Sequence, residues 1–235
     1  MSKKKLSLAS LLLALAASLA AAPANTADFV RSEGGKFVLN GDEFRFAGTN
    51  NYYMHYESDA MVDDVLGGAA AMGLKVLRLW GFFNGNNQLN RDHSTYMQTS
   101  PGIYGIPPEV VNKAAVYDGF ERLDHTVAYA KAKGIKLIIV AGNNWNDFGG
   151  INQHQEWFAL KSHDAFFRDD KAKKAYKAYI KYLVERVNKY TGIAYKDDPT
   201  VMAWELMNEP RCDSDKSGDS IVAWADEMSA FVKSI

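Results

Sequence analysis

The sequence predicts an α/β fold in which parallel strands alternate with helical crossovers. Helical stretches that end at glycine or proline are followed almost at once by short apolar runs, at 69–80, 128–141 and 197–206. The turns that enter these runs are short, whereas long, irregular connections leave them, with about 35 residues after Trp80 and about 30 after Ala141. Strands and helices that alternate in this way form parallel sheets, with the long connections gathered at the carboxyl ends of the strands.

The elements follow one another in a regular order from residue 29. Residues 29–41 predict a small hairpin that turns at a Gly-Gly pair, and residues 43–50 predict the first strand of the repeating units. Asp59–Met72 is the helix after that strand, with Ser58 as its N-cap. A strand follows each of the next helical stretches, so the order is strand–helix four times over.

Glycines mark the ends of the predicted helices. Gly73, Gly134 and Gly192 fit as the residues just after a helix, where a left-handed backbone is needed. The third helix is predicted from the long periodic stretch Asp170–Tyr190, and the fourth lies in residues 221–235.

Residues 1–24 predict a cleaved secretory signal peptide. Lysines 3 to 5 precede an uncharged run, Leu6–Ala22, that is rich in Leu, Ala and Ser and is followed by small residues. A membrane anchor is the alternative, but the run is near the lower limit for spanning a bilayer. Cleavage after Ala24 removes three lysines and so changes the formal net charge from −1 to −4. We therefore expect a secreted protein, extracellular or periplasmic, that is free of the membrane after cleavage.

The composition of residues 25–235 fits one sizeable domain. Its charge gives no sign of a nucleic-acid partner. Cys212 is the single cysteine, so no internal disulfide forms, and it is either a buried thiol or lacks its partner. Dinucleotide-binding, P-loop, zinc-protease and serine-hydrolase motifs are absent, and the five histidines show no helical metal spacing. The sequence therefore predicts neither a metal site nor a cofactor.

Aromatic and asparagine side chains gather in or next to the long connections. Flat rings beside amides suit a carbohydrate, because a sugar offers an apolar C–H face and a polar hydroxyl edge. Alternatively, some of the rings only hold long loops in place. The side chains are Tyr52, Tyr53, Tyr56, Trp80, Phe82, Phe83, Tyr96, Tyr104, Trp145, Phe148 and Trp157, with Asn50, Asn51, Asn84, Asn86, Asn87, Asn143, Asn144 and Asn146 among them.

The stretch MAWELMNEPR, residues 202–211, places a carboxylate at the end of a strand. Alternation along this last strand puts Glu205 on one face, and Asn208 and Glu209 follow just past its carboxyl end. Pro210 cannot donate a backbone hydrogen bond and biases Glu209 toward an extended backbone. We therefore expect Glu209 to be held at the mouth of the fold, the alternative being a solvated loop glutamate.

A charged residue is also predicted inside the second strand. Val76, Arg78 and Trp80 share one strand face, and a charge among such neighbours needs a partner. An ion pair with Glu205 would supply that partner, and this structural role is compatible with a role in a site.

Four blocks of sequence together resemble the family-five β-mannanases of glycoside hydrolase clan A. The blocks 44–56, 74–82, 143–150 and 203–212 look like the first four strands and loops of that family. The resemblance implies a (β/α)8 TIM barrel of which this chain covers roughly the first four β/α units. Residues 25–235 would then be the amino-terminal portion of a catalytic domain.

The same resemblance implies roles for individual residues. Glu209 would be the general acid/base, Asn208 would hydrogen-bond the substrate 2-hydroxyl, and Arg78 would orient the catalytic carboxylates and hold them ionised. No metal or cofactor would take part. The residues expected to bind substrate are Trp80, Asn51, Tyr52, Asn144 and Trp145.

The family's nucleophile has no counterpart in this sequence. Retaining glycosidases use two carboxylates about 5–5.5 Å apart, and the resemblance places the second one after a seventh strand. Nothing marks Glu57, Asp147 or Glu156 as a substitute. We therefore expect a chain truncated before the nucleophile. The alternatives are a half that pairs with itself or with a second half, and a shortened sugar binder; the oligomeric state stays open.

The predicted function is therefore retaining endo-hydrolysis of β-1,4-mannosidic linkages in mannan or glucomannan by the full-length enzyme. The expected partner is this polysaccharide. The alternatives are a β-1,4-glucanase of the same clan and a non-catalytic carbohydrate-binding half-barrel.

Overall fold

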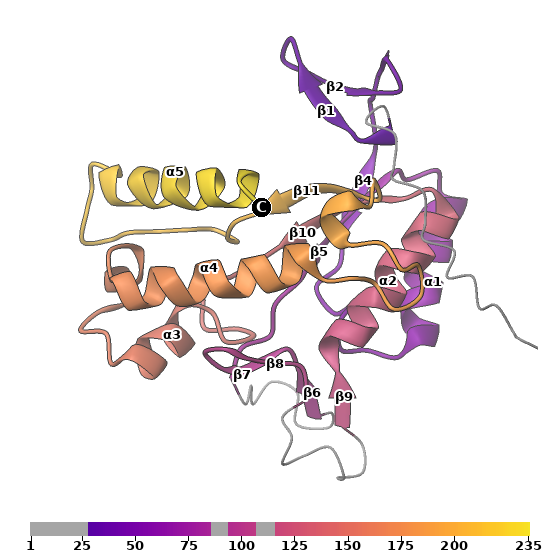
Figure 1. Ribbon diagram of the computed structural model, residues 1–235. Coiled ribbons are helices and arrows are strands. Elements are labelled where there is room, and N and C mark those ends of the chain that lie inside the picture. The colour runs from indigo at the N-terminus through magenta and orange to yellow at the C-terminus, as the bar shows by residue number, and fades with distance from the viewer. Residues whose placement is uncertain (1–27, 86–93, 107–115) are drawn as a thin grey trace, which may run out of the picture.

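The computed structural model describes residues 28–85, 94–106 and 116–235 (Figure 1). The predicted signal peptide, residues 1–24, lies outside this range, as do Asn86 and Asn87 of the long connection after Trp80. None of the helices within the described ranges is long and apolar enough to cross a membrane.

A four-stranded parallel sheet forms the centre of the molecule. Its strands are β4 (Gly48–Asn50), β5 (Val76–Trp80), β10 (Lys136–Val140) and β11 (Val201–Glu205), and they lie side by side in chain order. The predicted alternation of strands and helices is thereby confirmed. The expected first strand, 43–50, is divided, because Glu43 pairs with the hairpin and only Gly48–Asn50 joins the central sheet.

Helices cover one face of this sheet. Figure 1 shows α1 next to α2 and α4 next to α5. Leu77, Leu79, Leu137 and Ile139 are fully buried in the core on that side. Neighbouring residues on the opposite face, among them Arg78, stay partly exposed, so this face is more open to solvent. The helices are α1 (Asp59–Ala71), α2 (Gly119–Lys133), α4 (Asp170–Glu185) and α5 (Asp219–Lys233).

Three of the predicted helix boundaries are confirmed and one is wrong. Ser58 caps α1 through its side chain, and Gly73 after α1 and Gly134 after α2 both have a left-handed backbone. Gly192 closes no helix, because α4 ends at Glu185. The Asn188 side chain accepts hydrogen bonds from the backbone amides of residues 190 and 191, and such local bonds compete with helix formation.

The predicted hairpin is confirmed, whereas the long connections have more regular structure than expected. The hairpin consists of β1 (Arg31–Glu33) and β2 (Lys36–Leu39), extended by β3 (Asp42–Glu43). Within the described residues, the connection after β5 contains four short strands, and the connection after β10 contains two short helices. These elements are β6 (Ser94–Tyr96), β7 (Gln98–Ser100), β8 (Ile103–Tyr104), β9 (Val116–Asp118), α3 (Ile151–Phe158) and η3 (His163–Phe167), and η4 (Tyr195–Asp197) precedes β11.

Candidate active site

Arg78 links three strands at the carboxyl edge of the sheet. From β5 its guanidinium reaches across β10 and donates two hydrogen bonds to Glu205 on β11, with N–O distances of 2.7 and 2.5 Å. This confirms the predicted ion pair. It also donates to Asn50 Oδ1 at 3.0 Å and to Asn208 Oδ1 at 2.9 Å. The hydrogen bonds to Glu205 raise the pKa of Arg78, although burial opposes the charged form, so the guanidinium is a permanent positive charge.

Asn208 is held at both ends of its side-chain amide. Its oxygen accepts the bond from Arg78, and its nitrogen donates to Asn143 Oδ1 at 3.0 Å. An amide nitrogen carries two hydrogens, so one donor remains for a further partner. Asn208 therefore presents an oriented N–H group at the carboxyl edge of the sheet.

Glu209 has a left-handed backbone with φ of 48°. The prediction of an extended backbone is therefore wrong, although proline does follow. Hydrogen bonds on both sides of the residue explain the difference: Asn144 N donates to Asn208 O, and Arg211 N donates to Asn144 Oδ1. Positive φ is uncommon for a residue with a side chain, and such strain persists only where the surroundings fix it.

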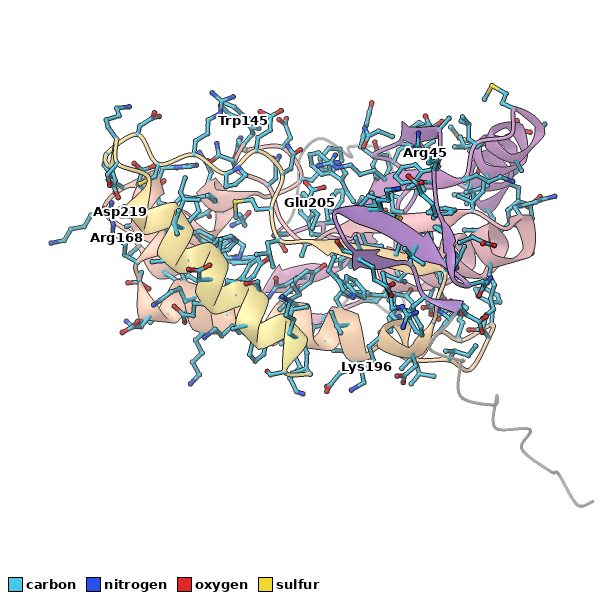
Figure 2. All side chains as sticks on the ribbon, turned by 90° about the horizontal axis from the view of Figure 1, so that it is seen from above. Arg45, Trp145, Arg168, Lys196, Glu205 and Asp219 are labelled. Carbon is cyan, nitrogen blue, oxygen red and sulfur yellow. The ribbon has the colours of Figure 1, made fainter. Side chains whose placement is uncertain are left out.

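The Glu209 carboxylate lies at the surface, beyond the carboxyl end of β11, and has one polar and one cationic partner. Trp145 Nε1 donates to its Oε2 at 3.0 Å, and the Arg211 guanidinium is 3.5 Å from the same oxygen. The side chain is 54 % exposed, so a ligand can reach it. Figure 2 shows Trp145 near the edge of the molecule, with Glu205 of the Arg78 pair further in.

The rings predicted to bind substrate differ in exposure. Trp145 and Tyr52 are 43 % and 49 % exposed, and the Arg211 guanidinium lies over the Trp145 ring, 5.1 Å from its centroid. Trp80 is half-buried and stacks on Phe82 with centroids 4.8 Å apart. Trp145 and Tyr52 therefore present the more accessible ring faces.

The two asparagines predicted to bind substrate make bonds within the protein. Asn51 Oδ1 accepts from Tyr53 N at 2.9 Å, and Asn51 N donates to Arg78 O. Asn144 is only 4 % exposed, and its Oδ1 accepts from Arg211 N at 2.9 Å. In this arrangement both asparagines order the loops that carry other site residues.

A hollow of about 470 Å³ opens beside Trp145. That volume lies in the range of small-molecule sites, and the lining mixes a ring with amides and carboxylates, which suits a polyhydroxylated ligand. The hollow is lined by Asn144, Trp145, Asn146, Asn152, Ser162, His163, Asp164 and Asp213.

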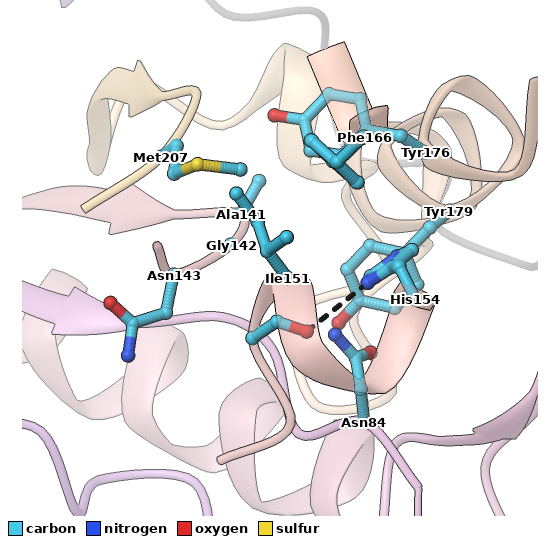
Figure 3. Close-up of a pocket in the computed structure, with 11 residues that line it drawn as sticks. Asn84, Ala141, Gly142, Asn143, Ile151, His154, Phe166, Tyr176, Tyr179 and Met207 are labelled. Carbon is cyan, nitrogen blue, oxygen red and sulfur yellow. Dashed lines mark hydrogen bonds between the residues drawn. The ribbon is translucent and has the colours of Figure 1, made fainter. Parts of the chain in front are cut away.

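A second cavity, shown in Figure 3, lies beneath the β10 loop and holds only about 10 Å³. This is about the room that one water molecule needs, so a sugar cannot enter. His154 lines it and shares a 3.4 Å hydrogen bond with Gly150 O. Burial lowers the pKa of His154 to about 4, so its ring is neutral at pH 7.

The histidines and the cysteine do not form a metal centre in the described part of the chain. No group of three or more His, Cys, Asp and Glu side chains there could hold an ion. Cys212 is a buried free thiol with its sulfur 3.5 Å from Arg168 Nη2. Independence from metals and cofactors stays a prediction.

Comparison with known proteins identifies the family. Residues 27–235 match the family model described as GH family 5 beta-mannosidase-like. The chain belongs to this family. Putative mannan endo-1,4-beta-mannosidase 4 of Arabidopsis thaliana is 40 % identical over 219 residues, which are 88 % of this chain and 49 % of that protein. Mannan endo-1,4-beta-mannosidase 5 of Solanum lycopersicum is 41 % identical over 222 residues, 90 % of this chain and 49 % of the relative.

Solved structures of this glycoside hydrolase family share the fold. An endo-1,4-beta-D-mannanase from Thermotoga petrophila is 54 % identical with a TM-score of 0.77, covering 81 % of this chain and 52 % of the other. An endo-1,4-beta-mannanase from Rhizomucor miehei is 32 % identical with a TM-score of 0.76, covering 88 % and 57 %. The chain spans about half the length of these relatives. The predicted fold class, the first β/α units of an incomplete TIM barrel, is confirmed.

Sequence reasoning missed two contributors to this glycosidase-family site. Arg211 reaches both the Glu209 carboxylate and the Trp145 ring. Asn143, which the sequence placed only among the loop amides, directly holds the side chain of Asn208. The position of Arg211 right after Pro210 was a usable signal, whereas the partner of Asn143 lies 65 residues away in the chain.

Proposed function

We propose that the protein takes part in retaining endo-hydrolysis of β-1,4-mannosidic linkages in mannan or glucomannan, with Glu209 as the general acid/base. The observation that carries the proposal is the Glu209 carboxylate at the rim. It is half-exposed, contacts Trp145 and Arg211, and lies on the segment that also carries the oriented amide of Asn208.

The geometry around Glu209 suits proton transfer to and from a sugar. As an acid, the carboxyl group would protonate the glycosidic oxygen while the bond to the leaving sugar breaks. As a base, it would then take a proton from the attacking water. Trp145 supports this role because its N–H fixes one carboxylate oxygen and its exposed ring offers a face on which a sugar can stack. Asn208 would offer its free N–H to the 2-hydroxyl.

The second carboxylate of the reaction has no assigned residue among those that the structure describes. Glu205 is the other carboxylate of the Arg78 network, and both of its oxygens accept bonds from that arginine. A nucleophile must lie about 5–5.5 Å from the acid/base group. The proposal for this chain therefore covers the acid/base half of the reaction.

The substrate class follows from relatives and from the site. The relatives bear the name mannan endo-1,4-beta-mannosidase, and the exposed rings and amides of the site suit a neutral polysaccharide. β-1,4-Glucan is the competing substrate. The protein would meet this polymer outside the cell or in the periplasm, because a basic patch and an uncharged Leu- and Ala-rich run begin the sequence. Amino-terminal sequencing of exported protein would test cleavage near Ala24.

The central test compares Glu209→Gln with the unchanged chain. Reducing ends released from mannan would be measured, with β-1,4-glucan as a second polymer. If the unchanged chain releases reducing ends from mannan, release by the variant should be about 10²–10⁴-fold lower, the usual worth of a general acid/base group. Glu156→Gln, at an exposed carboxylate on α3, is the matched control and should keep wild-type release.

A non-catalytic carbohydrate binder is the second candidate, favoured by the two unpaired edges, β4 and β11, of the central sheet within the described residues. Mannan binding by the unchanged chain without any release of reducing ends would support the binder and contradict hydrolysis by this chain. Affinity electrophoresis in mannan-containing gels measures that binding. Faster release from glucan than from mannan would overturn the substrate assignment.

A further inference from the structure

The backbone around Glu209 is fixed by the loop that follows β10. Asn208 N donates to Gly142 O at 2.9 Å, and Asn144 N donates to Asn208 O at 3.1 Å. These bonds continue the parallel pairing of β10 and β11 beyond the strands themselves. They end immediately before Glu209, so backbone pairing alone does not hold the residues after it.

Asn144 supplies the restraint on the other side of Glu209. Its Oδ1 accepts the backbone N–H of Arg211 at 2.9 Å, and its side chain is almost entirely buried. Pro210 has no N–H to contribute, so the bond to Arg211 is the first backbone anchor after the glutamate. Together with the bond at Asn208, it fixes both ends of the short segment 208–211, which contains Glu209.

Asn143 fixes the neighbouring side chain. Its Oδ1 accepts from Asn208 Nδ2 at 3.0 Å, and its own Nδ2 donates to Asp147 O at 3.2 Å. The loop that carries both asparagines turns back tightly at Gly150, where a Cβ atom would lie only 2.4 Å from Asn143 O. A loop folded this closely gives the two amides little freedom.

We propose that Asn143 and Asn144 are positioning residues that hold Asn208 and Glu209 in their working orientation. Asn144 stabilises the left-handed backbone of Glu209 by binding Arg211 N, and Asn143 orients the amide of Asn208. Neither asparagine needs to touch the substrate for this role. The inference rests on the proposed function, because Glu209 is the group being positioned.

The consequence for the carboxylate is specific. A left-handed Glu209 aims its side chain at Trp145, whose indole N–H donates to Oε2. Without the Oδ1 of Asn144, Arg211 N would have no acceptor, and the backbone of Glu209 could relax from positive φ. That relaxation would move the Glu209 carboxylate away from the Trp145 indole. The indole N–H of Trp145 therefore reports the position of Glu209 without any need for turnover.

The test follows the indole ¹H–¹⁵N signal of Trp145 in the 235-residue chain. The sequence contains five tryptophans, so Trp145→Phe assigns the signal, and Glu209→Gln identifies its titration by that carboxyl. In Asn144→Leu we expect the signal to move toward that of a solvated indole and to lose the titration. Asn144→Asp keeps an acceptor for Arg211 N and should restore the hydrogen-bonded signal.

Asn188→Leu is the matched control. Asn188 is also fully buried and also accepts backbone N–H bonds, but it lies before β11, at the opposite edge of the sheet. Removing the Asn188 amide should lower the melting temperature of the protein and leave the Trp145 indole signal unchanged. A folded Asn144→Leu protein with wild-type signal and titration would overturn the proposal. If that variant does not fold, Asn144→Ser, whose hydroxyl cannot reach Arg211 N, replaces it. A shifted Trp145 signal without titration would support the proposal, and a wild-type signal with titration would overturn it.

Asn143 is tested through the amide that it holds. In Asn143→Leu the side-chain NH₂ signals of Asn208 should lose their dispersion, whereas an unchanged pair of signals would contradict its assigned role. Neither experiment depends on activity. Failure of the chain to hydrolyse mannan would therefore count against the proposed function alone, and the spectra would still decide whether the two asparagines position Asn208 and Glu209.

Discussion

Two hydrogen-bond networks, one near the carboxyl ends and one near the amino ends of the strands, contain the same kinds of side chain but serve different purposes. At the carboxyl edge, Arg78 donates two hydrogen bonds to Glu205 and another to Asn208. At the amino edge, Arg186 grips Asp124 with N–O distances of 2.9 and 2.7 Å, and Asn188 binds the backbone of that aspartate. Each network thus joins a forked arginine, a carboxylate and an asparagine.

The two networks differ in how completely they are closed. The Asp124 side chain is 0 % exposed, and its oxygens also accept from Tyr195 OH and Lys189 N. Burial lowers the pKa of Arg186, but the bonds and charge of Asp124 outweigh it, so the pKa is raised. The Glu205 side chain is 32 % exposed. A closed network serves stability, whereas an open one leaves donors and space for a ligand.

The largest expected effect would come from Asp124→Asn. This change leaves the Arg186 charge in a buried site without its counter-charge, and breaking such a pair costs about 3–5 kcal/mol of unfolding free energy. Urea unfolding followed by circular dichroism measures the loss. Asp213→Asn, at a 91 % exposed carboxylate paired only with Lys216, is the control and should change little. Equal midpoints for the two variants would contradict the closed-network interpretation.

A second prediction concerns low pH, which should lower the stability of the fold near the carboxyl end of β4. His55 follows β4, is fully buried among Tyr56, Phe83 and Phe148, and has no hydrogen-bond partner among the described residues for either ring nitrogen. Burial lowers its pKa to about 3. Because the unfolded chain binds a proton near pH 6.5 and the folded chain does not, the stability from His55 is complete above pH 6.5 and falls as the pH drops toward 3. The loss from pH 7 to 5 is about 2 kcal/mol.

His55→Phe should reduce this pH dependence, since a phenyl ring fits an aromatic surrounding and does not titrate. The part that remains comes from His154, whose pKa burial also lowers. Urea midpoints between pH 7 and 5 measure the slope, and hydrogen exchange shows which edge opens first. His125→Gln, at a partly exposed histidine that contacts Asp63, should keep most of the slope. If His55→Phe retained the full wild-type slope, acid sensitivity would have another source.

The smallest expected effect would come from Glu205→Gln, which is the matched partner of Asp124→Asn. Arg78 is 26 % exposed and keeps its bonds to Asn50 and Asn208. Water can solvate the freed charge, so we expect a loss of about 1 kcal/mol in unfolding free energy. The same urea titration applies. A loss as large as that of Asp124→Asn would show that the open network carries as much stability as the closed one.

Local patterns were enough to predict much of the fold. Ser58 and Gly134 marked helix ends because capping depends on neighbours a few residues away. The apolar run before Asn208 placed the candidate acid/base at the end of a strand for the same reason. The helix end expected at Gly192 failed because the side-chain oxygen of Asn188 binds the backbone of residues 190 and 191, while its nitrogen donates to Asp124, 64 residues earlier.

The sequence by itself determined which residues would reach the carboxyl edge, because strand periodicity and chain order fix that placement. Only the tertiary structure decided how they are oriented there. The left-handed backbone of Glu209 depends on an acceptor, Asn144, that lies 67 residues from Arg211. Local preference at the residue before a proline favours another conformation. Hydrogen bonds between distant segments override that preference, and they require the pairing of β10 with β11 that brings Asn144 beside residues 208–211.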